Sequence, residues 1–148
     1  MFQDTSTIEF KHQMFVDRVV ENLIVWALKS DEGYATSESN EYEDVEVIPF
    51  WSDRAYADAL AKDEWESFQS HAMPLSEFLE DWVVGMSNDG LIVGTNWDLN
   101  LFGKEVEPLD LALEITSKLI QQDKAIAFKK YRDISDYHNQ LRKALGIE

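Results

Sequence analysis

The strongest constraint on the fold is a helical pattern that runs directly into a β-rich apolar run near the N-terminus. Four apolar residues recur at helical spacing, namely Phe15, Val16, Val19 and Leu23. They predict a helix from Ser6 to Asn22. The residues IVWAL that follow favour a strand, and KSDEG (Lys29 to Gly33) is typical of a hairpin turn. A chain that opens with a helix and a hairpin must bury both kinds of element against one core.

Helical and strand patterns alternate along the rest of the chain. VEVIPFW predicts a strand with Pro49 near its end, and SDRAYADAL predicts a helix with Ser52 as its N-cap. A brief strand is expected in 66–73, a short helix in 74–86, and a strand in LIVGTN after the turn SNDG. We therefore expect an α+β fold, with a small and mostly antiparallel sheet of about four strands packed against several helices.

The last part of the chain differs from the rest in charge. Residues 1–110 contain 24 acidic and 6 basic residues, whereas residues 111–148 contain 5 acidic and 7 basic residues. Pro108 is placed to begin an amphipathic helix, and a second helical segment is expected from Ala125 to Gly146, broken near Asp133. We expect one domain over residues 1–148. Within it, a C-terminal helical hairpin or arm, 116–148, would pack on the acidic body that precedes it.

Composition narrows the classes of partner. The chain has 148 residues and a net charge of −16, so it should repel nucleic acid and anionic membranes and attract a basic protein. It has no cysteine, which excludes disulfides, thiol catalysis and thiolate metal sites. No secretory signal is evident, and the longest apolar run, LIVWAL, is too short to cross a bilayer. We therefore expect a cytoplasmic protein.

A search for motifs that carry chemistry identifies no catalytic residue, no metal site and no cofactor site. The glycines match neither dinucleotide nor Walker spacing, and the acidic segment from Glu38 to Glu46 lacks the order of an EF-hand loop. His12, His71 and His138 are isolated in the sequence, so whether they meet carboxylates in a pocket is left open.

The tryptophans are the remaining candidates. Trp26 and Trp82 are expected in the core, whereas Trp51 and Trp97 fall at strand-to-loop junctions where a half-exposed ring can anchor a partner. Phe102 lies in the same predicted loop as Trp97, and Arg54 is one of only 6 bases in the acidic body. We predict a binding surface that includes Trp51, Arg54, Trp97 and Phe102.

Tryptophans, glycines and prolines, with a few other residues, follow one another in a specific order along the chain: Trp26, Gly33, Pro49, Trp51, Phe78, Trp82, Gly85, Asp89-Gly90, Asn96-Trp97 and Pro108. Together these residues resemble a known family of small bacterial proteins, domain-of-unknown-function family 2750. The resemblance covers roughly residues 8–115. It implies a bacterial origin and a compact α+β fold, and it brings no catalytic residue, cofactor or substrate with it.

Three functional hypotheses follow from the sequence. The first is a non-catalytic module that binds another protein, with an immunity or antitoxin-like inhibitor of a basic toxin as its sharper form. The second is a small hydrolase that uses carboxylates and a histidine, which would require Asp53, Arg54 and His71 to line one pocket. The third is a homodimer through the C-terminal helices, for which docking of the arm on its own body is the alternative.

Overall fold

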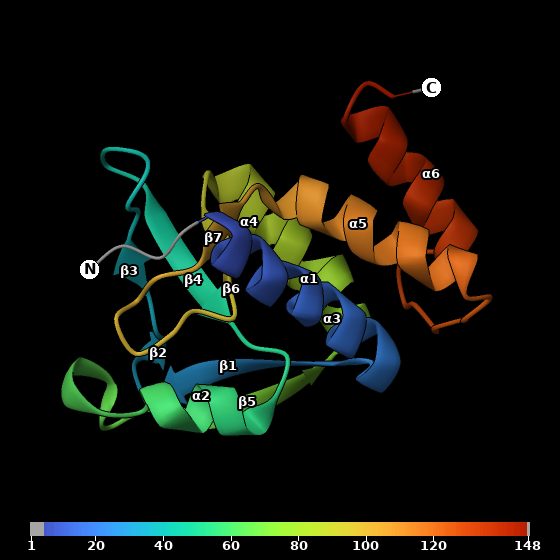
Figure 1. Cartoon of the computed structure of the whole chain (residues 1–148). Helices are drawn as coiled ribbons and strands as arrows, with labels where there is room; N and C mark the ends of the chain where they lie inside the picture. The colour runs from blue at the N-terminus through green and yellow to red at the C-terminus, as the bar shows by residue number, and fades with distance from the viewer. Residues whose placement is uncertain (1–4, 148) are drawn as a thin grey trace.

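The computed structural model describes residues 5–147, in which helices and strands alternate along the chain (Figure 1). The α-helices are α1 (Thr5–Asn22), α2 (Arg54–Leu60), α3 (Leu75–Glu77), α4 (Val84–Asp89), α5 (Pro108–Gln121) and α6 (Ile134–Ala144). Two further helical segments are the 3-10 turn η1 (Asp63–Trp65) and the π-helical segment η2 (Phe78–Val83). The strands are β1 (Ile24–Ser30), β2 (Gly33–Tyr34), β3 (Ser37–Glu38), β4 (Glu46–Phe50), β5 (Gln69–Pro74), β6 (Ile92–Thr95) and β7 (Lys104–Val106).

The strands form two sheets. One has the order β2-β1-β5 and is antiparallel, and the other has the order β3-β4-β6-β7, in which only β4 and β6 run parallel. Trp26 of β1 and Trp51, just after β4, exchange two backbone hydrogen bonds of 2.9 and 2.8 Å and join the sheets. The α+β class and the mostly antiparallel pairing are confirmed. The strands divide between two sheets because the chain turns away into α2 directly after this single bridge.

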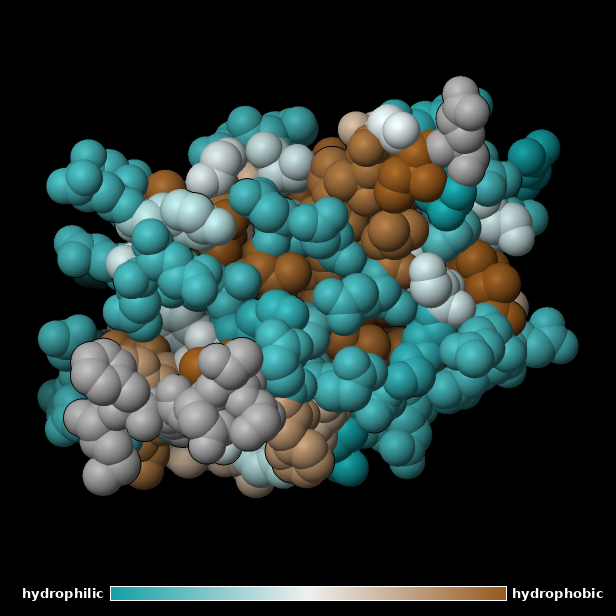
Figure 2. Space-filling model, turned by 45° about the horizontal axis from the view of Figure 1, so that its top comes forward, coloured by the Kyte–Doolittle hydropathy of each residue, from teal (hydrophilic) through white to brown (hydrophobic). Residues whose placement is uncertain are grey.

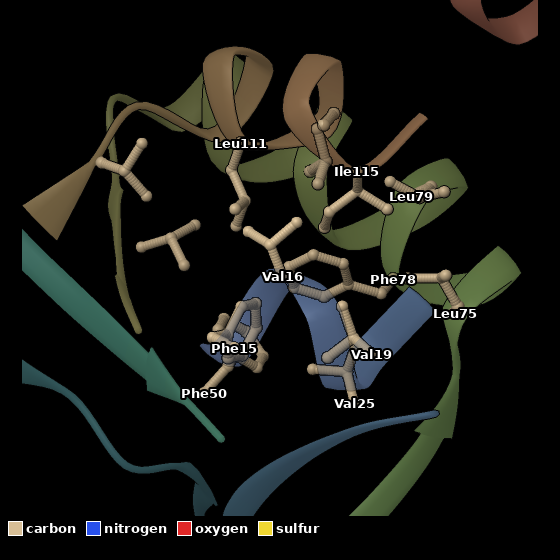
Figure 3. Packing of buried hydrophobic residues seen from close by; sticks show 14 of the residues in the cluster. Phe15, Val16, Val19, Val25, Phe50, Leu75, Phe78, Leu79, Leu111 and Ile115 are labelled. Atoms are coloured by element: carbon tan, nitrogen blue, oxygen red, sulfur yellow. The ribbon is translucent and has the colours of Figure 1, made fainter. Parts of the chain in front are cut away.

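The main core lies between α1, the helices α3 to α5, and the inner faces of the sheets. Figure 3 shows how the side chains converge: Phe15 and Val19 from α1 point toward Phe50 of β4, Phe78 of η2 and Ile115 of α5. All five are fully buried. The helical pattern at the N-terminus therefore predicts the correct buried face of α1, since its apolar residues are those that reach this core.

The C-terminal arm docks on the body through the π-helical segment. The buried Glu80 carboxylate accepts hydrogen bonds from the backbone N–H groups of Lys129 (2.8 Å) and Lys130 (2.6 Å). The Tyr137 hydroxyl donates to the carbonyl of Leu79 (2.8 Å), and burial raises the pKa of this hydroxyl above its usual range. Tyr137 and Leu141 belong to the main core. The arm is thus part of the single-chain fold, and a homodimer through these helices stays a prediction.

An apolar patch marks the surface where α6 meets α5, beside the C-terminus in Figure 2. A hollow of about 230 Å³ lies there, lined among others by Leu109, Tyr137, Leu141 and Ala144. Within the described residues, no helix is long and apolar enough to span a bilayer.

Two predictions of local structure need correction. Ser52 is not the N-cap of α2: the cap is Asp53, and Ser52 is buried against Asn96. The second C-terminal helix is shorter than predicted, because residues 122–133 are largely irregular and α6 begins at Ile134. The break predicted near Asp133 is confirmed, since its side chain caps α6 by accepting from the N–H of Asp136 (2.8 Å).

Candidate functional site

Three loops meet at the end of the molecule away from α6, on the left of Figure 1. They are 39–45 between β3 and β4, 61–68 between α2 and β5, and 96–103 between β6 and β7, and we call them together the loop end. Leu101 connects them: its carbonyl accepts from the Asn40 side chain (3.4 Å), and its side chain contacts the clusters that contain Trp65 and Val45. The loop end is therefore one continuous surface made from three distant parts of the sequence.

Trp51 and Trp97 lie underneath the loop end and not on it. Their exposed fractions are 0% and 1%, so the expectation that these rings are half-exposed is wrong. The Trp51 indole N–H donates to the carbonyl of Trp97 (3.0 Å), and the Trp97 indole N–H donates to the carbonyl of Lys104 (3.1 Å). A buried indole that has a hydrogen-bond partner is a stable core residue. Both tryptophans hold the loops in place, and neither can touch a partner in this structure.

Trp26 and Trp82 are also placed differently from the prediction. Both are half-buried and not fully in the core. Trp26 faces α2, where the guanidinium of Arg54 lies 5.9 Å from its ring centroid. Trp82 packs edge-on against Tyr34, with ring centroids 4.4 Å apart. The junction tryptophans are fully enclosed, whereas the surroundings of Trp26 and Trp82 leave these two rings partly exposed.

The 96–103 loop is held rigidly by its own polar side chains. Asn96, at a positive φ of 49°, accepts the N–H of Ser52 on its side-chain oxygen (2.9 Å). The Asp98 carboxylate accepts the N–H groups of Asn100 (2.9 Å) and Phe102 (3.2 Å). Leu101 has a φ of 60°, a conformation that costs a leucine on the order of 1–2 kcal/mol. Strained residues of this kind concentrate at functional surfaces.

The loop end is strongly acidic and its charges are largely uncompensated. Its three loops contain seven acidic residues and one basic residue, Lys62. Among the described residues, Asp98 is the only one of the seven with an ion pair, to Lys11 at 3.4 Å. The other six are exposed: Glu41, Glu43, Asp44, Asp63, Glu64 and Glu66. Hydrophilic side chains accordingly project from the left of the molecule in Figure 2.

Two exposed apolar side chains lie on the loops that carry these acids, and they line separate hollows: Tyr42 lies with Ile92 and Lys104 at a hollow of about 320 Å³. Leu99 and Tyr42 are each 54% exposed. Beside Leu99 is a hollow of about 220 Å³ whose lining includes Leu60, Trp65 and Leu101 together with Asp63 and Glu64. An apolar centre with a charged rim is the usual anatomy of a protein-binding surface.

The other two predicted binding residues, Arg54 and Phe102, lie on different surfaces of the molecule. The Arg54 side chain is 70% exposed and pairs with Asp58 at 3.6 Å on the outer face of α2. Phe102 is half-buried in the 96–103 loop, where its carbonyl accepts from the Lys11 ammonium (3.0 Å). Phe102 is thus part of the loop end, and Arg54 belongs to the neighbouring surface beside Trp26.

The structure does not bring Asp53, Arg54 and His71 together, as the hydrolase hypothesis requires. Asp53 is bound by Arg18 through two hydrogen bonds of 2.6 and 2.5 Å. Although partial burial opposes ionisation, the hydrogen bonds from Arg18 and Ser52 hold the pKa of Asp53 below its usual value. His71 lies on the other side of β5, in an open hollow of about 730 Å³ that it shares with Lys29, Asp31 and Tyr34.

His12 does meet a carboxylate, although inside the fold. Its Nε2 lies 2.9 Å from Glu114, and its Nδ1 lies 2.9 Å from the hydroxyl of Thr95. Burial alone would raise the pKa of Glu114, but the hydrogen bond and charge of His12, with Lys104 and Lys118 nearby, hold it below its usual value. These are the groups of a hydroxyl–imidazole–carboxylate triad. Because Thr95 and His12 are buried, the chain of contacts joins α1, β6 and α5 and offers no open hydroxyl.

The third histidine is separate from the other two. His138 of α6 bonds Thr116 of α5 (2.8 Å), and burial together with Arg142 lowers the pKa of His138. Within residues 5–147, no group of three or more histidine and carboxylate side chains is arranged to hold a metal ion.

Comparison with known families identifies the relatives of this chain. A family model described as a protein of unknown function (DUF2750) matches residues 12–115. The chain belongs to the DUF2750 family. Neither curated proteins nor solved structures gave a match. The DUF2750 region ends inside α5, so it includes all three loops of the loop end and excludes the docked arm.

The sequence contained part of the signal for this site. The predicted binding residue Phe102 lies in the loop end, and so does most of the acidic segment Glu38 to Glu46, which the sequence indicates only as a polar loop without EF-hand order. Leu99 is not predicted, because an isolated leucine in a polar loop carries no pattern that distinguishes it from a core residue.

Proposed function

We propose that this DUF2750 protein is a non-catalytic binding module whose loop end binds a basic protein. The observation that carries the proposal is a group of six exposed acids that have no ion pair within residues 5–147, on the same three loops as the exposed Leu99 and Tyr42. Like charges gathered on one surface repel one another, and a basic partner relieves that repulsion while it covers the apolar centre.

The rigidity of the loops supports the same function. Asp98 and Asn96 fix the backbone of the 96–103 loop, and two buried indoles support it from below. A surface that is already ordered loses little conformational entropy when it binds. The loop end is therefore suited to recognition of a folded partner without rearrangement.

A direct test compares two variants with the same change in net charge. The first neutralises the loop end with Glu41→Gln, Asp63→Asn and Glu64→Gln. The control neutralises three exposed acids elsewhere with Glu21→Gln, Asp89→Asn and Asp123→Asn. Wild-type and both variants are used to capture partners from the native host's lysate, and the captured protein is then purified and its affinity measured.

We expect the loop-end variant to lose at least tenfold in affinity and the control to stay within threefold of the wild type. Binding should also weaken steeply between low and high salt, because exposed charges are screened over about 8 Å at physiological ionic strength. Equal affinities for the two variants, or no stoichiometric partner at either salt concentration, would refute the proposal.

The sharper form, an immunity or antitoxin-like inhibitor, is favoured by the same acidic surface. The basic cleft of a nuclease toxin is a partner of the right charge, and electrostatic steering would bring association rates to about 10⁸ M⁻¹s⁻¹ at low salt. Stopped-flow mixing with the captured partner separates the two forms. A rate that is slow and insensitive to salt would exclude the inhibitor and leave only an ordinary binding module.

A further inference from the structure

We propose that the outer edge of β5 receives an extended, basic segment of the partner as an added β-strand. This inference rests on the proposed function, because it names a second contact of the same partner next to the loop end. Gln69, the first residue of β5, directly follows the 61–68 loop.

The backbone pairing of β1 determines which groups of β5 point outward. Trp26 bonds to Trp51, on the side of β1 away from β5, and the carbonyl of Leu28 accepts from Ala35 on that same side. The alternate residues of β1 therefore bond to β5. Their register partners are Met73, His71 and Gln69, whose N–H and C=O groups face inward. It follows that the N–H and C=O groups of Ser70 and Ala72 face away from the sheet.

These outward groups have no partner within the described chain. No hydrogen bond joins the backbone of Ser70 or Ala72 to any other segment of residues 5–147, and Ala72 is exposed. Pro74 fits the same pattern, since it lies at an outward position where its missing N–H costs no ladder bond. Unpaired strand groups of this kind are a template for another strand.

Apart from Pro74 at its end, the edge lacks the usual protection against pairing. β5 reads QSHAMP and carries no lysine, aspartate or glutamate. Helix α2 packs against β1 and β5, and the Ser70 hydroxyl bonds Asp58 of α2, while Ala72 of β5 stays exposed beside it (Figure 1). An exposed edge without a charged residue is uncommon in a protein that stays monomeric.

Charge determines the chemistry of the occupant. Residues 58–77, which contain and flank the edge, hold five acids and one base, Lys62. The open hollow of about 730 Å³ on the His71 side is lined by Asp31, Glu32 and Tyr34 as well as Lys29. An added strand alternates its side chains between the two faces, so every second residue would lie on the face of this hollow, and those beside Gln69 to His71 would lie nearest to it. Lysine or arginine at those positions matches the surrounding carboxylates.

A second copy of this chain is the less favoured occupant. Two edges brought together would also bring together two sets of flanking acids, in molecules that each carry a net charge of −16. Like charges in direct apposition oppose pairing. The flanking acids would attract a basic partner, whereas they would repel a second copy.

The probe is a seven-residue peptide of alternating lysine and valine, with its glutamate–valine counterpart as the charge control. Amide hydrogen exchange of the full-length protein is followed by NMR. We expect the lysine peptide to slow exchange at Ser70 and Ala72 at least tenfold, and the glutamate peptide to leave both rates unchanged. A lysine peptide that does not bind at millimolar concentration, or binds without slowing these two amides, overturns the inference.

The matched variants are Ala72→Pro and Ala72→Val. Proline removes the outward N–H but no β1–β5 hydrogen bond, whereas valine keeps that N–H and suits a strand. We expect Ala72→Pro to bind the peptide at least tenfold more weakly than Ala72→Val. If Ala72→Pro does not fold, the exchange rates of Ser70 and Ala72 in the wild-type protein with the peptide decide whether a strand is added.

Capture of the partner separates this inference from the proposed function. If Ala72→Pro captures the partner as well as Ala72→Val does while the loop-end charge variant fails, strand addition is refuted and the loop end remains the binding surface. If Ser70 and Ala72 become protected only as protein concentration rises and a dimer forms, the occupant is a second copy and the inference is wrong.

Discussion

The contact between Gly94 and Trp97 gives the sharpest test of how the loop end is built. Gly94 lies in β6, and a Cβ added there would lie 2.6 Å from Cε2 and 2.7 Å from Nε1 of the Trp97 indole. The ring cannot move aside freely, because it is 1% exposed and its N–H bonds the carbonyl of Lys104 (3.1 Å). The change Gly94→Ala therefore forces either the strand or the ring to shift.

The sign of the stability change on replacement by alanine distinguishes Gly94 from a strand glycine that has no such contact. In the middle of a strand, replacing glycine with alanine normally stabilises by about 0.5–1 kcal/mol. Overpacking of a buried site costs about 1–3 kcal/mol, and loss of the indole hydrogen bond adds about 1 kcal/mol. We expect Gly94→Ala to lower the free energy of unfolding by about 2–3 kcal/mol.

Urea denaturation followed by far-UV circular dichroism measures the change. With a slope of about 2 kcal/mol per molar urea, the midpoint should fall by about 1–1.5 M. Gly85→Ala is the matched control, because no atom lies within 4 Å of its added Cβ, and it should gain about 0.5–1 kcal/mol. In a Trp97→Phe background, Gly94→Ala should cost less, since the smaller ring leaves room. A stability for Gly94→Ala equal to or above that of the wild type would refute the reasoning.

Three further predictions concern the docked arm and the ion pairs. Glu80→Ala should lower the free energy of unfolding by about 2–4 kcal/mol, because it leaves the N–H groups of Lys129 and Lys130 without their acceptor. Glu80→Gln keeps the accepting oxygen and should cost less stability in the same urea titration. Tyr137→Phe should cost about 1 kcal/mol through loss of the bond to Leu79, and a value near zero would show that this bond adds nothing. The pKa of Asp53 is lowered in the folded protein, so its contribution to stability is complete above the ordinary carboxyl pKa and is lost as the pH falls through the lowered value. Asp53→Asn should therefore flatten the fall in thermal midpoint below about pH 4, and an unchanged profile would contradict the assigned cause.

Local patterns predicted the elements that bury one clear face. The N-terminal helix, the hairpin after IVWAL, and the helix that begins at Pro108 all appear where periodicity and turn residues placed them. Local patterns do not predict the division into two sheets, because it depends on the pairing of Trp26 with Trp51 and on the short strands β3 and β7. Strands of two or three residues carry too few positions for a pattern to show.

The candidate site was predicted in its location more than in its residues. The loop with Trp97 and Phe102 does form part of the loop end, but Trp97 supports it from beneath. A tryptophan at a strand-to-loop junction is expected to be exposed, because the sequence does not show which residues will pack on it. Here Gly94 and Gly103 let their backbones approach the Trp97 indole closely, and the carbonyl of Lys104 accepts the indole N–H. The exposure of a tryptophan is a tertiary property, which spacing along the chain does not contain.

Several bases of the chain are engaged by ion pairs and hydrogen bonds on the side of the body away from the loop end. Lys118 pairs with Asp17, Lys130 pairs with Asp81, and the Lys124 ammonium donates to the carbonyl of Val20 (2.9 Å), so bases of the arm are engaged by the side of the body on which the arm docks. Arg18 is likewise held by Asp53. Among the described residues, six of the seven acids of the loop end have no such partner. Since these bases of the arm are engaged on the side where the arm docks, they do not neutralise the loop end, and the proposed basic partner would supply that charge.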